Sequence, residues 1–219
     1  MRKFALITKK ERWSTTWLGK IVGLGIIVLV VFLGIRNVHP YLAVSKPIPS
    51  EVMILEGFLP DFAIEESVKI FREENYKLML VTGKKLIKGS LLVPFKDDGH
   101  YTAAILSHMG LDSALIKVIS LNNDVKKDRT FASAKAVLDW MEQTDTRPQA
   151  VNVVSLGVHA RRSRLLFEKA FSGKVETGII SISDIGYDAN KWWKSSYGFK
   201  TVLNETLAWF YVCFFFSGS

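Results

Sequence analysis

A histidine and three arginines directly follow an apolar run in the second half of the chain, from Val151 to Arg164. The β-branched residues of the run are typical of a strand buried on both faces, and Gly157 permits a sharp turn at its end. A helix that begins after this turn points its free N–H groups and the positive end of its dipole toward the same space as the basic side chains. The segment therefore predicts a binding site for an anion, either phosphate or carboxylate.

The helical phase divides these basic residues into two groups. With about 100° per residue, a helix that starts near His159 places His159, Arg162 and Ser163 on the side of its apolar residues. Arg161 and Arg164 then fall on the opposite, solvated side. We therefore expect His159 and Arg162 to face a crevice above the sheet. A solvated basic helix end with one satisfied histidine is the alternative interpretation.

An apolar segment near the N-terminus predicts a membrane span. No polar residue occurs from Ile21 to Ile35, and the stretch 17–36 matches the roughly 20 residues that cross a bilayer. We interpret it as an uncleaved signal anchor. A cleaved signal peptide is the alternative, with Ala43-Val-Ser45 as a faint cleavage site.

Four regions follow from this interpretation. Residues 1–16 form a basic tail and residues 17–36 form the anchor. Residues 37–50 form a linker stiffened by Pro40, Pro47 and Pro49. Residues 51–219 form the main domain.

The distribution of charge predicts the orientation of the span. Six basic residues and one acid precede Ile21, so this part of the chain accounts for five of the eight net positive charges. The positive-inside rule therefore keeps the N-terminus in the cytosol and exports the main domain. The remainder is only weakly basic and has no aromatic and basic pattern of a nucleic-acid module, so we expect no nucleic-acid partner.

Cysteine and histidine give no sign of a metal site. The one cysteine, Cys213, lies in an apolar C-terminal segment and cannot form an internal disulfide. The histidines His39, His100, His108 and His159 are scattered, without an HExxH motif or paired Cys/His spacing. We predict no metal ligands, and no residue pattern identifies a cofactor.

Strands and helices are expected to alternate along the main domain. Strands are predicted at 52–55, 78–81, 116–121, 151–156 and 175–182, and helices at 61–74, 101–109, 130–141, 161–171 and 201–216. Asp61 is the expected N-cap of the first helix. This alternation predicts an α/β fold, with a Rossmann-like parallel sheet of about five strands and helices on both faces.

Ligands of such sheets bind beyond the carboxyl ends of the strands, where the strand order reverses. If the order is 3-2-1-4-5, which the sequence leaves open, the first and fourth strands are neighbours and Glu56 faces His159. We predict Glu56, His159 and Arg162 as the residues that carry chemistry. The expected ligand-binding residues are Gly57, Thr82, Gly83, Arg129, Thr130, Gly157 and Ser163.

Four motifs resemble those of the YdcF/SanA/ElyC family of bacterial proteins. They are Glu56-Gly-Phe-Leu-Pro-Asp61, Arg129-Thr-Phe-Ala-Ser-Ala134, the segment Gly157 to Arg164, and Trp192-Trp-Lys-Ser-Ser196. They occur in the family's order and resemble most closely a membrane-anchored branch. The resemblance covers most of residues 51–216.

The resemblance implies a Rossmann-like domain and a role in bacterial cell-envelope or peptidoglycan biogenesis. It carries the family's H-x-x-R pair onto His159 and Arg162, and it matches Gly83 and Thr130 to the family's turn glycine and helix-opening threonine. One member of the family is reported to bind S-adenosylmethionine. The chain departs from the pattern near Ala103, where the family usually has a glutamate. Either Glu56 supplies the carboxylate instead, or acid/base chemistry at this site is impaired.

Three functions stay open at this point. The first is an inner-membrane protein, single-pass, with its main domain on the extracytoplasmic side. It binds an anionic small molecule or a phosphate-bearing, lipid-linked precursor beside the bilayer, and whether it also hydrolyses this ligand stays open. The second binds or scaffolds such a ligand without catalysis. The third binds S-adenosylmethionine, although only one glycine follows the first strand.

Overall fold

A computed structural model of the chain describes residues 14–86, 94–121, 125 and 127–218. The chain divides into two compact units, Met1–Asn37 and Val38–Ser219. The first thirteen residues, which carry most of the predicted basic tail, lie outside the described residues.

The first helix, α1 (Trp17–Leu42), is long and apolar enough to cross a membrane, with a mean hydropathy of 2.6 over its best window. It is longer than the predicted span and includes Pro40, so the expected linker begins only after Leu42. Proline inside a helix loses one backbone hydrogen bond. The last turn nevertheless stays helical because Leu42 is buried, with Val158 and Val202 in the same apolar cluster of the second unit.

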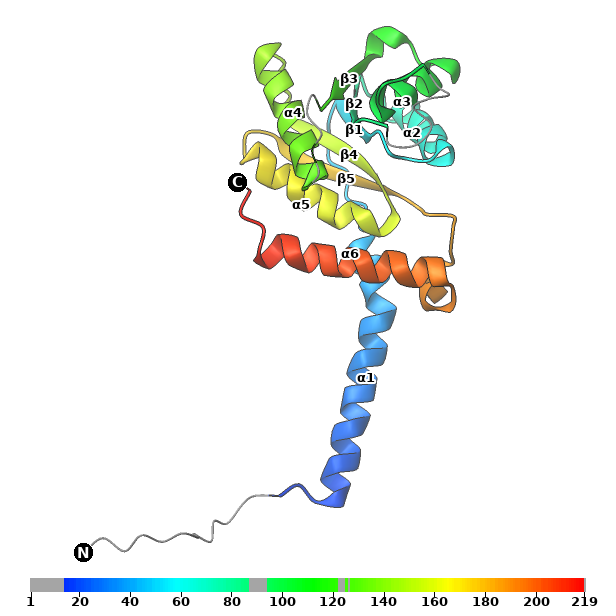
Figure 1. Ribbon diagram of the computed structural model, residues 1–219, viewed down its shortest axis with the longest axis vertical. Coiled ribbons are helices and arrows are strands. Elements are labelled where there is room, and N and C mark those ends of the chain that lie inside the picture. Colours follow the sequence, from blue (N-terminus) through cyan, green and yellow to red (C-terminus); the bar gives the residue numbers. More distant parts are fainter. Residues whose placement is uncertain (1–13, 87–93, 122–124, 126, 219) are drawn as a thin grey trace, which may run out of the picture. The chain divides into compact units, whose positions relative to one another are not determined.

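The sheet of the second unit has five parallel strands in the order β3-β2-β1-β4-β5 (Figure 1). This confirms the predicted α/β class, and the order is the one on which the predicted site depends. The bounds are β1 (Val52–Glu56), β2 (Leu78–Gly83), β3 (Ile116–Ser120), β4 (Ala150–Leu156) and β5 (Glu176–Ile182).

Helices cover both faces of this sheet. On one face, Met53 and Leu55 of β1 share an apolar cluster with residues of α2 (Asp61–Glu73) and α3 (Asp98–His108). On the other face, Val52 and Ile54 share a cluster with residues of α4 (Arg129–Gln143) and α5 (Ala160–Phe171). Alternate residues of β1 thus enter opposite cores, which explains its continuous apolar sequence.

The last helix, α6 (Ser196–Phe214), packs against α5 rather than against the sheet (Figure 1). It begins five residues earlier than expected, because the Ser195 hydroxyl accepts a hydrogen bond from the Gly198 N–H and caps it. A 3-10 segment, η3 (Ala189–Lys194), precedes α6 and buries Trp192. Two shorter 3-10 turns are η1 (Ser113–Leu115) and η2 (Gly157–His159).

Two other helix starts differ from the sequence prediction. Asp61 is the first residue of α2 and not its N-cap, which is Pro60, and no side chain caps this end. Helix α3 begins at Asp98 instead of residue 101, because the Asp97 carboxylate accepts a hydrogen bond from the His100 N–H and adds a turn. This extra turn brings an acidic side chain into the site.

Candidate functional site

A pocket of about 570 Å³ lies beyond the carboxyl ends of the central strands. Glu56, Thr82 and Leu156, at the ends of β1, β2 and β4, form part of its wall. Helices α4, α5 and α6 supply much of the rest, together with the start of α3, the turn η2 and the loops after the strands. The pocket-lining residues of α6 are Tyr197, Thr201, Glu205, Ala208, Tyr211 and Val212. This is the position at which parallel α/β sheets bind ligands, where the order reverses between β1 and β4.

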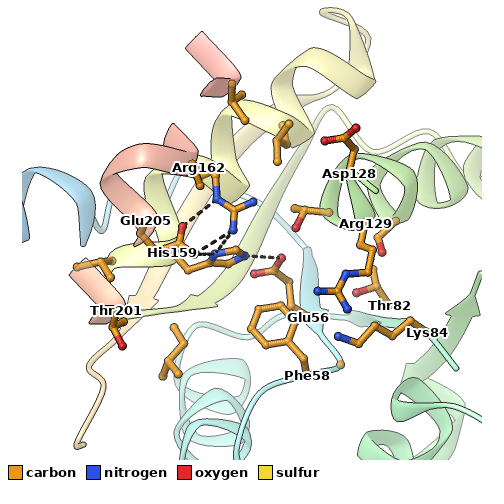
Figure 2. Close-up of a pocket in the computed structure, with 18 of the residues that line it drawn as sticks. Glu56, Phe58, Thr82, Lys84, Asp128, Arg129, His159, Arg162, Thr201 and Glu205 are labelled. Carbon is orange, nitrogen blue, oxygen red and sulfur yellow. Dashed lines mark hydrogen bonds and ion pairs between the residues drawn. The ribbon is translucent and has the colours of Figure 1, made fainter. Parts of the chain in front are cut away.

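The imidazole of His159 lies between two carboxylates (Figure 2). Its Nδ1 lies 3.0 Å from Glu205 Oε1, and its Nε2 lies 3.8 Å from Glu56 Oε1. The ring of Phe58 packs against the imidazole edge to face, with 5.3 Å between the ring centroids. The side chain of His159 is only 14% exposed, so the imidazole is held in one orientation.

The protonation state of His159 Nδ1 determines which of two neighbours it hydrogen-bonds. When protonated, Nδ1 donates to Glu205; when unprotonated, it accepts from Arg162 Nη2, which lies 2.8 Å away. In the second case the ring carries its proton on Nε2 and directs it toward Glu56. The cluster can therefore shift a proton between the two sides of the imidazole, as a general acid or base requires.

Glu205 stays ionised in this cluster. Burial acts to raise its pKa, but hydrogen bonds and the positive charges of His159 and Arg162 outweigh that effect and hold the pKa at about 2. Arg162 donates from Nε to Oε2 at 2.8 Å and from Nη2 to Oε1 at 3.0 Å. The guanidinium is thereby fixed beside His159.

Glu56 is the buried carboxylate of the site, with 3% of its surface exposed. It accepts from Ser163 Oγ, which lies 3.1 Å and 3.0 Å from its two oxygens. Ser163 also contacts Ser155 Oγ at 3.3 Å. Ser163 therefore positions Glu56 from behind, and it is not among the pocket-lining residues, although the sequence predicted it as a ligand contact.

Two cations occupy the other side of the pocket. The Lys84 and Arg129 side chains reach toward Glu56 from the side opposite His159 (Figure 2). The pKa of Lys84 is lowered, first by burial and second by the positive charge of Arg129, against the opposing effects of Asp98 and Glu56. In the part of the chain that the structure describes, no carboxylate forms an ion pair with Arg129.

Asp98 supplies an acid at the start of α3. Its Oδ1 accepts from the Lys84 N–H at 2.6 Å, and its Oδ2 lies 4.0 Å from Lys84 Nζ. Burial raises the pKa of Asp98, and the contacts with Lys84 oppose that rise. The segment from Tyr101 to Ala104 contains no acid, but the structure places Asp98, five residues before Ala103, on the pocket wall.

Most of the predicted site residues meet in this pocket. They are Glu56, Gly57, Thr82, Gly83, Arg129, Thr130, His159 and Arg162. Gly157 does not line it, and instead provides the turn from β4 into η2 with a φ of +47°, a conformation that favours glycine. Gly57 has a packing role as well, because a Cβ there would lie 2.2 Å from the Thr82 carbonyl oxygen.

Arg161 and Arg164 lie away from the pocket, as the helical phase predicted, but neither is fully solvated. The Arg161 guanidinium stacks on the Tyr41 ring at 3.8 Å and its Nε donates to the Tyr41 carbonyl. Arg164 pairs with Glu168 at 2.7 Å. Arg161 is covered because the end of α1, which was predicted to be a linker, packs against the start of α5.

Sequence reasoning missed several pocket residues that carry charge. Lys84 directly follows a predicted strand end, and Asp98 belongs to an Asp-Asp-Gly sequence typical of a helix start. Glu205 is the only acid in α6, and a lone carboxylate in an apolar helix is a recognisable sign of a buried partner. Each of these residues could be singled out in the sequence, but the residues that they contact in the pocket could not, because most of them lie far away along the chain.

Within the described ranges, no three His, Cys, Asp or Glu side chains gather as a metal ion would need. In comparisons with known proteins, no family model and no curated protein matches this sequence. The function is therefore inferred from the residues of the site itself.

Proposed function

We propose that this chain is a membrane-anchored bacterial cell-envelope protein of the YdcF/SanA/ElyC type, and that its pocket binds a phosphate-bearing envelope precursor. One observation carries the proposal. Lys84 and Arg129 face the same side of the pocket closely enough for the charge of Arg129 to lower the pKa of Lys84.

Two cations held together in a partly buried site repel each other, and the repulsion is relieved when an anion lies between them. Arg129 is also the first residue of α4, and no side-chain cap occupies this helix end. The free N–H groups there supply further donors for phosphate oxygens. A phosphate or pyrophosphate group fits this combination better than an uncharged ligand.

Hydrolysis is the second function that a specific observation favours. Nε2 of His159 is buried, has no hydrogen-bond partner among the described residues, and lies 3.8 Å from Glu56. In this proposal Glu205 and Arg162 orient the imidazole, which takes a proton from a water as the water oxygen bonds to phosphorus and the P–O bond to the leaving phosphate breaks. Lys84 and Arg129 stabilise the negative charge that develops on the phosphate oxygens and on the leaving phosphate.

Apolar helix α1 and the resemblance support the location of the protein. We propose that α1 anchors it in the inner membrane and that the second unit lies on the extracytoplasmic side. The basic excess before Ile21 supports this orientation. A ligand carried by a lipid would then meet the pocket beside the bilayer.

The test uses the full chain in detergent micelles and four probes: inorganic phosphate, pyrophosphate, a polyprenyl pyrophosphate and S-adenosylmethionine. Calorimetry measures binding, and release of phosphate measures turnover. We expect pyrophosphate and polyprenyl pyrophosphate to bind, and Lys84→Ala to lower the affinity for both. Lys85→Ala, which alters an exposed neighbouring residue, should leave the affinity unchanged.

The outcomes separate the alternatives. Phosphate release that is lost in His159→Ala supports hydrolysis, and binding without release supports a binding protein. Binding of S-adenosylmethionine alone would reject the proposed ligand class.

A further inference from the structure

Helix α6 presents two faces of opposite character. One face carries Thr201, Glu205, Ala208 and Val212 and lines the pocket. The other face carries large apolar side chains that are 43% to 71% exposed, namely Phe199, Leu203, Leu207, Phe210 and Phe214. At about 100° per residue the centres of the two sets lie roughly 170° apart around the helix.

The outward face is unusual for a surface in contact with water. Five large apolar residues form a continuous stripe along about four turns of one helix. Single soluble domains rarely expose such a patch without a partner. Glu205, the only acid in α6, points into the pocket, so no carboxylate of this helix lies on the stripe. Lys200 is exposed beside it.

The second unit itself shows what lies close to this helix. Val38–Leu42, which follow the apolar stretch of α1 after Arg36 and Asn37, belong to the second unit. The Tyr41 ring packs edge to face on Trp209 of α6 with 5.3 Å between the centroids, and Leu42 is buried in the same cluster as Val202. Only five residues separate Ile35, the end of the apolar stretch, from Tyr41, so the chain enters the second unit beside Val202 and Trp209 of α6.

Tryptophan and tyrosine side chains lie beside the apolar stripe of α6. Trp209 flanks the stripe on one side, and Tyr211, which also lines the pocket, flanks it on the other. Tryptophan and tyrosine are enriched at the boundary between lipid headgroups and acyl chains, where one part of the ring is apolar and the other is hydrated.

We propose that the outward face of α6 is a membrane-binding surface, and that α6 lies in the plane of the bilayer interface with this stripe inserted among the headgroups. The occupant of the apolar face is lipid, because the chain's own anchor brings the bilayer to it. This inference depends on the anchoring part of the proposed function and goes beyond it.

The proposed membrane contact would bring the pocket close to lipid headgroups. The lipid-facing and pocket-facing surfaces belong to one helix, about one helix diameter apart, which is roughly 10 Å. A headgroup in the outer leaflet can therefore reach Glu205 and His159 without leaving its membrane. We infer that the pocket acts on phosphate groups that are attached to lipids in the same bilayer.

The experiment places one fluorophore on the full chain in vesicles of phosphatidylcholine and phosphatidylglycerol. Cys213→Ser removes the native thiol, and Leu207→Cys carries an environment-sensitive NBD label on the stripe. Asp139→Cys, on an exposed position of α4, is the matched control. Val28→Cys, within the apolar stretch of α1, reports whether the anchor is inserted.

We expect NBD at position 207 to emit at shorter wavelength than NBD at position 139. Lipids with a nitroxide near the headgroup should quench it more strongly than lipids with a nitroxide deep in the acyl chain, and iodide should quench it weakly. Position 28 should show the opposite dependence on depth, and position 139 should respond to iodide alone.

Four results would contradict the proposal or the anchoring on which it depends. Quenching of position 207 by iodide as strong as at position 139 would show a surface in water. Protection from both quenchers would show that protein covers the stripe, most simply a second copy of the chain. If nitroxide lipids do not quench NBD at position 28, α1 is not inserted in the bilayer and the proposed anchoring is wrong. If they quench NBD at position 28 but not at position 207, only the proposed membrane contact of α6 is wrong.

Discussion

Arg162 of α5 and Glu205 of α6, 43 residues apart in the chain, face each other in two hydrogen bonds of 2.8 Å and 3.0 Å. The same carboxylate lies 3.0 Å from His159 Nδ1. Helix α6 therefore completes a cluster whose other members, His159 and Arg162, come from η2 and α5. A role for α6 in orienting the imidazole follows directly from this contact.

The Glu205 carboxylate should contribute to stability in a pH-dependent way. Its folded pKa of about 2 lies below the ordinary value of 4.5, so its contribution is full above pH 4.5 and is lost as the pH falls toward 2. A shift of this size corresponds to about 3 kcal/mol. Denaturant unfolding of the full chain in micelles, followed by near-UV circular dichroism between pH 6 and pH 2, measures it.

Glu205→Gln imitates the protonated carboxyl group and serves as the control. We expect it to lower the unfolding free energy by about 3 kcal/mol at neutral pH, and to flatten the pH dependence between 4.5 and 2. Parallel pH curves for the variant and the original chain would mean that another carboxylate accounts for the acid lability.

Lys84 and Arg129 should determine how anion binding depends on alkaline pH. Loss of one charge-assisted contact costs about 1.5–3 kcal/mol, or roughly ten- to a hundredfold in affinity for pyrophosphate. Because the pKa of Lys84 lies below its ordinary 10.5, affinity should decline as the pH rises through that lowered value. Titration calorimetry at a series of pH values measures the decline.

Two variants isolate the cause of this decline. Lys84→Arg keeps its charge at every pH used, so its affinity should not fall in the alkaline range. Arg129→Ala removes a positive neighbour, so it should weaken binding and move the decline to higher pH. An unchanged decline in Lys84→Arg would assign it to a different group.

Arg161 and Arg162 are neighbours in sequence with different expected roles. His159→Ala and Arg162→Ala should impair function, because they disrupt the cluster around Glu205. Arg161→Ala should leave pyrophosphate affinity unchanged but lower stability by about 1–2 kcal/mol, since it removes the stacking on Tyr41.

Complementation in cells, with thermal unfolding of each purified variant, distinguishes these outcomes. Equal loss of function in folded Arg161→Ala and Arg162→Ala proteins would show that the basic cluster acts as a whole. Normal function in all three variants would mean that the pocket is not the functional site.

The orientation of α1 can be tested independently of the pocket. A reporter that is active only outside the cytosol should be active when fused after Ser219, and a reporter that is active only in the cytosol should be active when fused before Met1. The reason is the excess of basic residues before Ile21. The reverse activities would invert the proposed topology.

The elements of the fold could be predicted from local patterns in the sequence. Apolar β-branched runs such as Val151–Leu156 indicated buried strands, and turn residues such as Gly157 marked where they end. The alternation of strands and helices then favoured a parallel sheet, because crossover connections require it. The phase of α5 likewise separated Arg162 from Arg161 correctly.

The tertiary structure alone decided which charges meet. The strand order brings Glu56 of β1 beside His159, and the packing of α6 on α5 supplies Glu205, which no spacing in the sequence links to residue 159. Arg161, which was predicted to be solvated, packs on Tyr41 at the end of α1. Local patterns report which face of an element is apolar, whereas the pairing of distant side chains depends on how whole elements pack together.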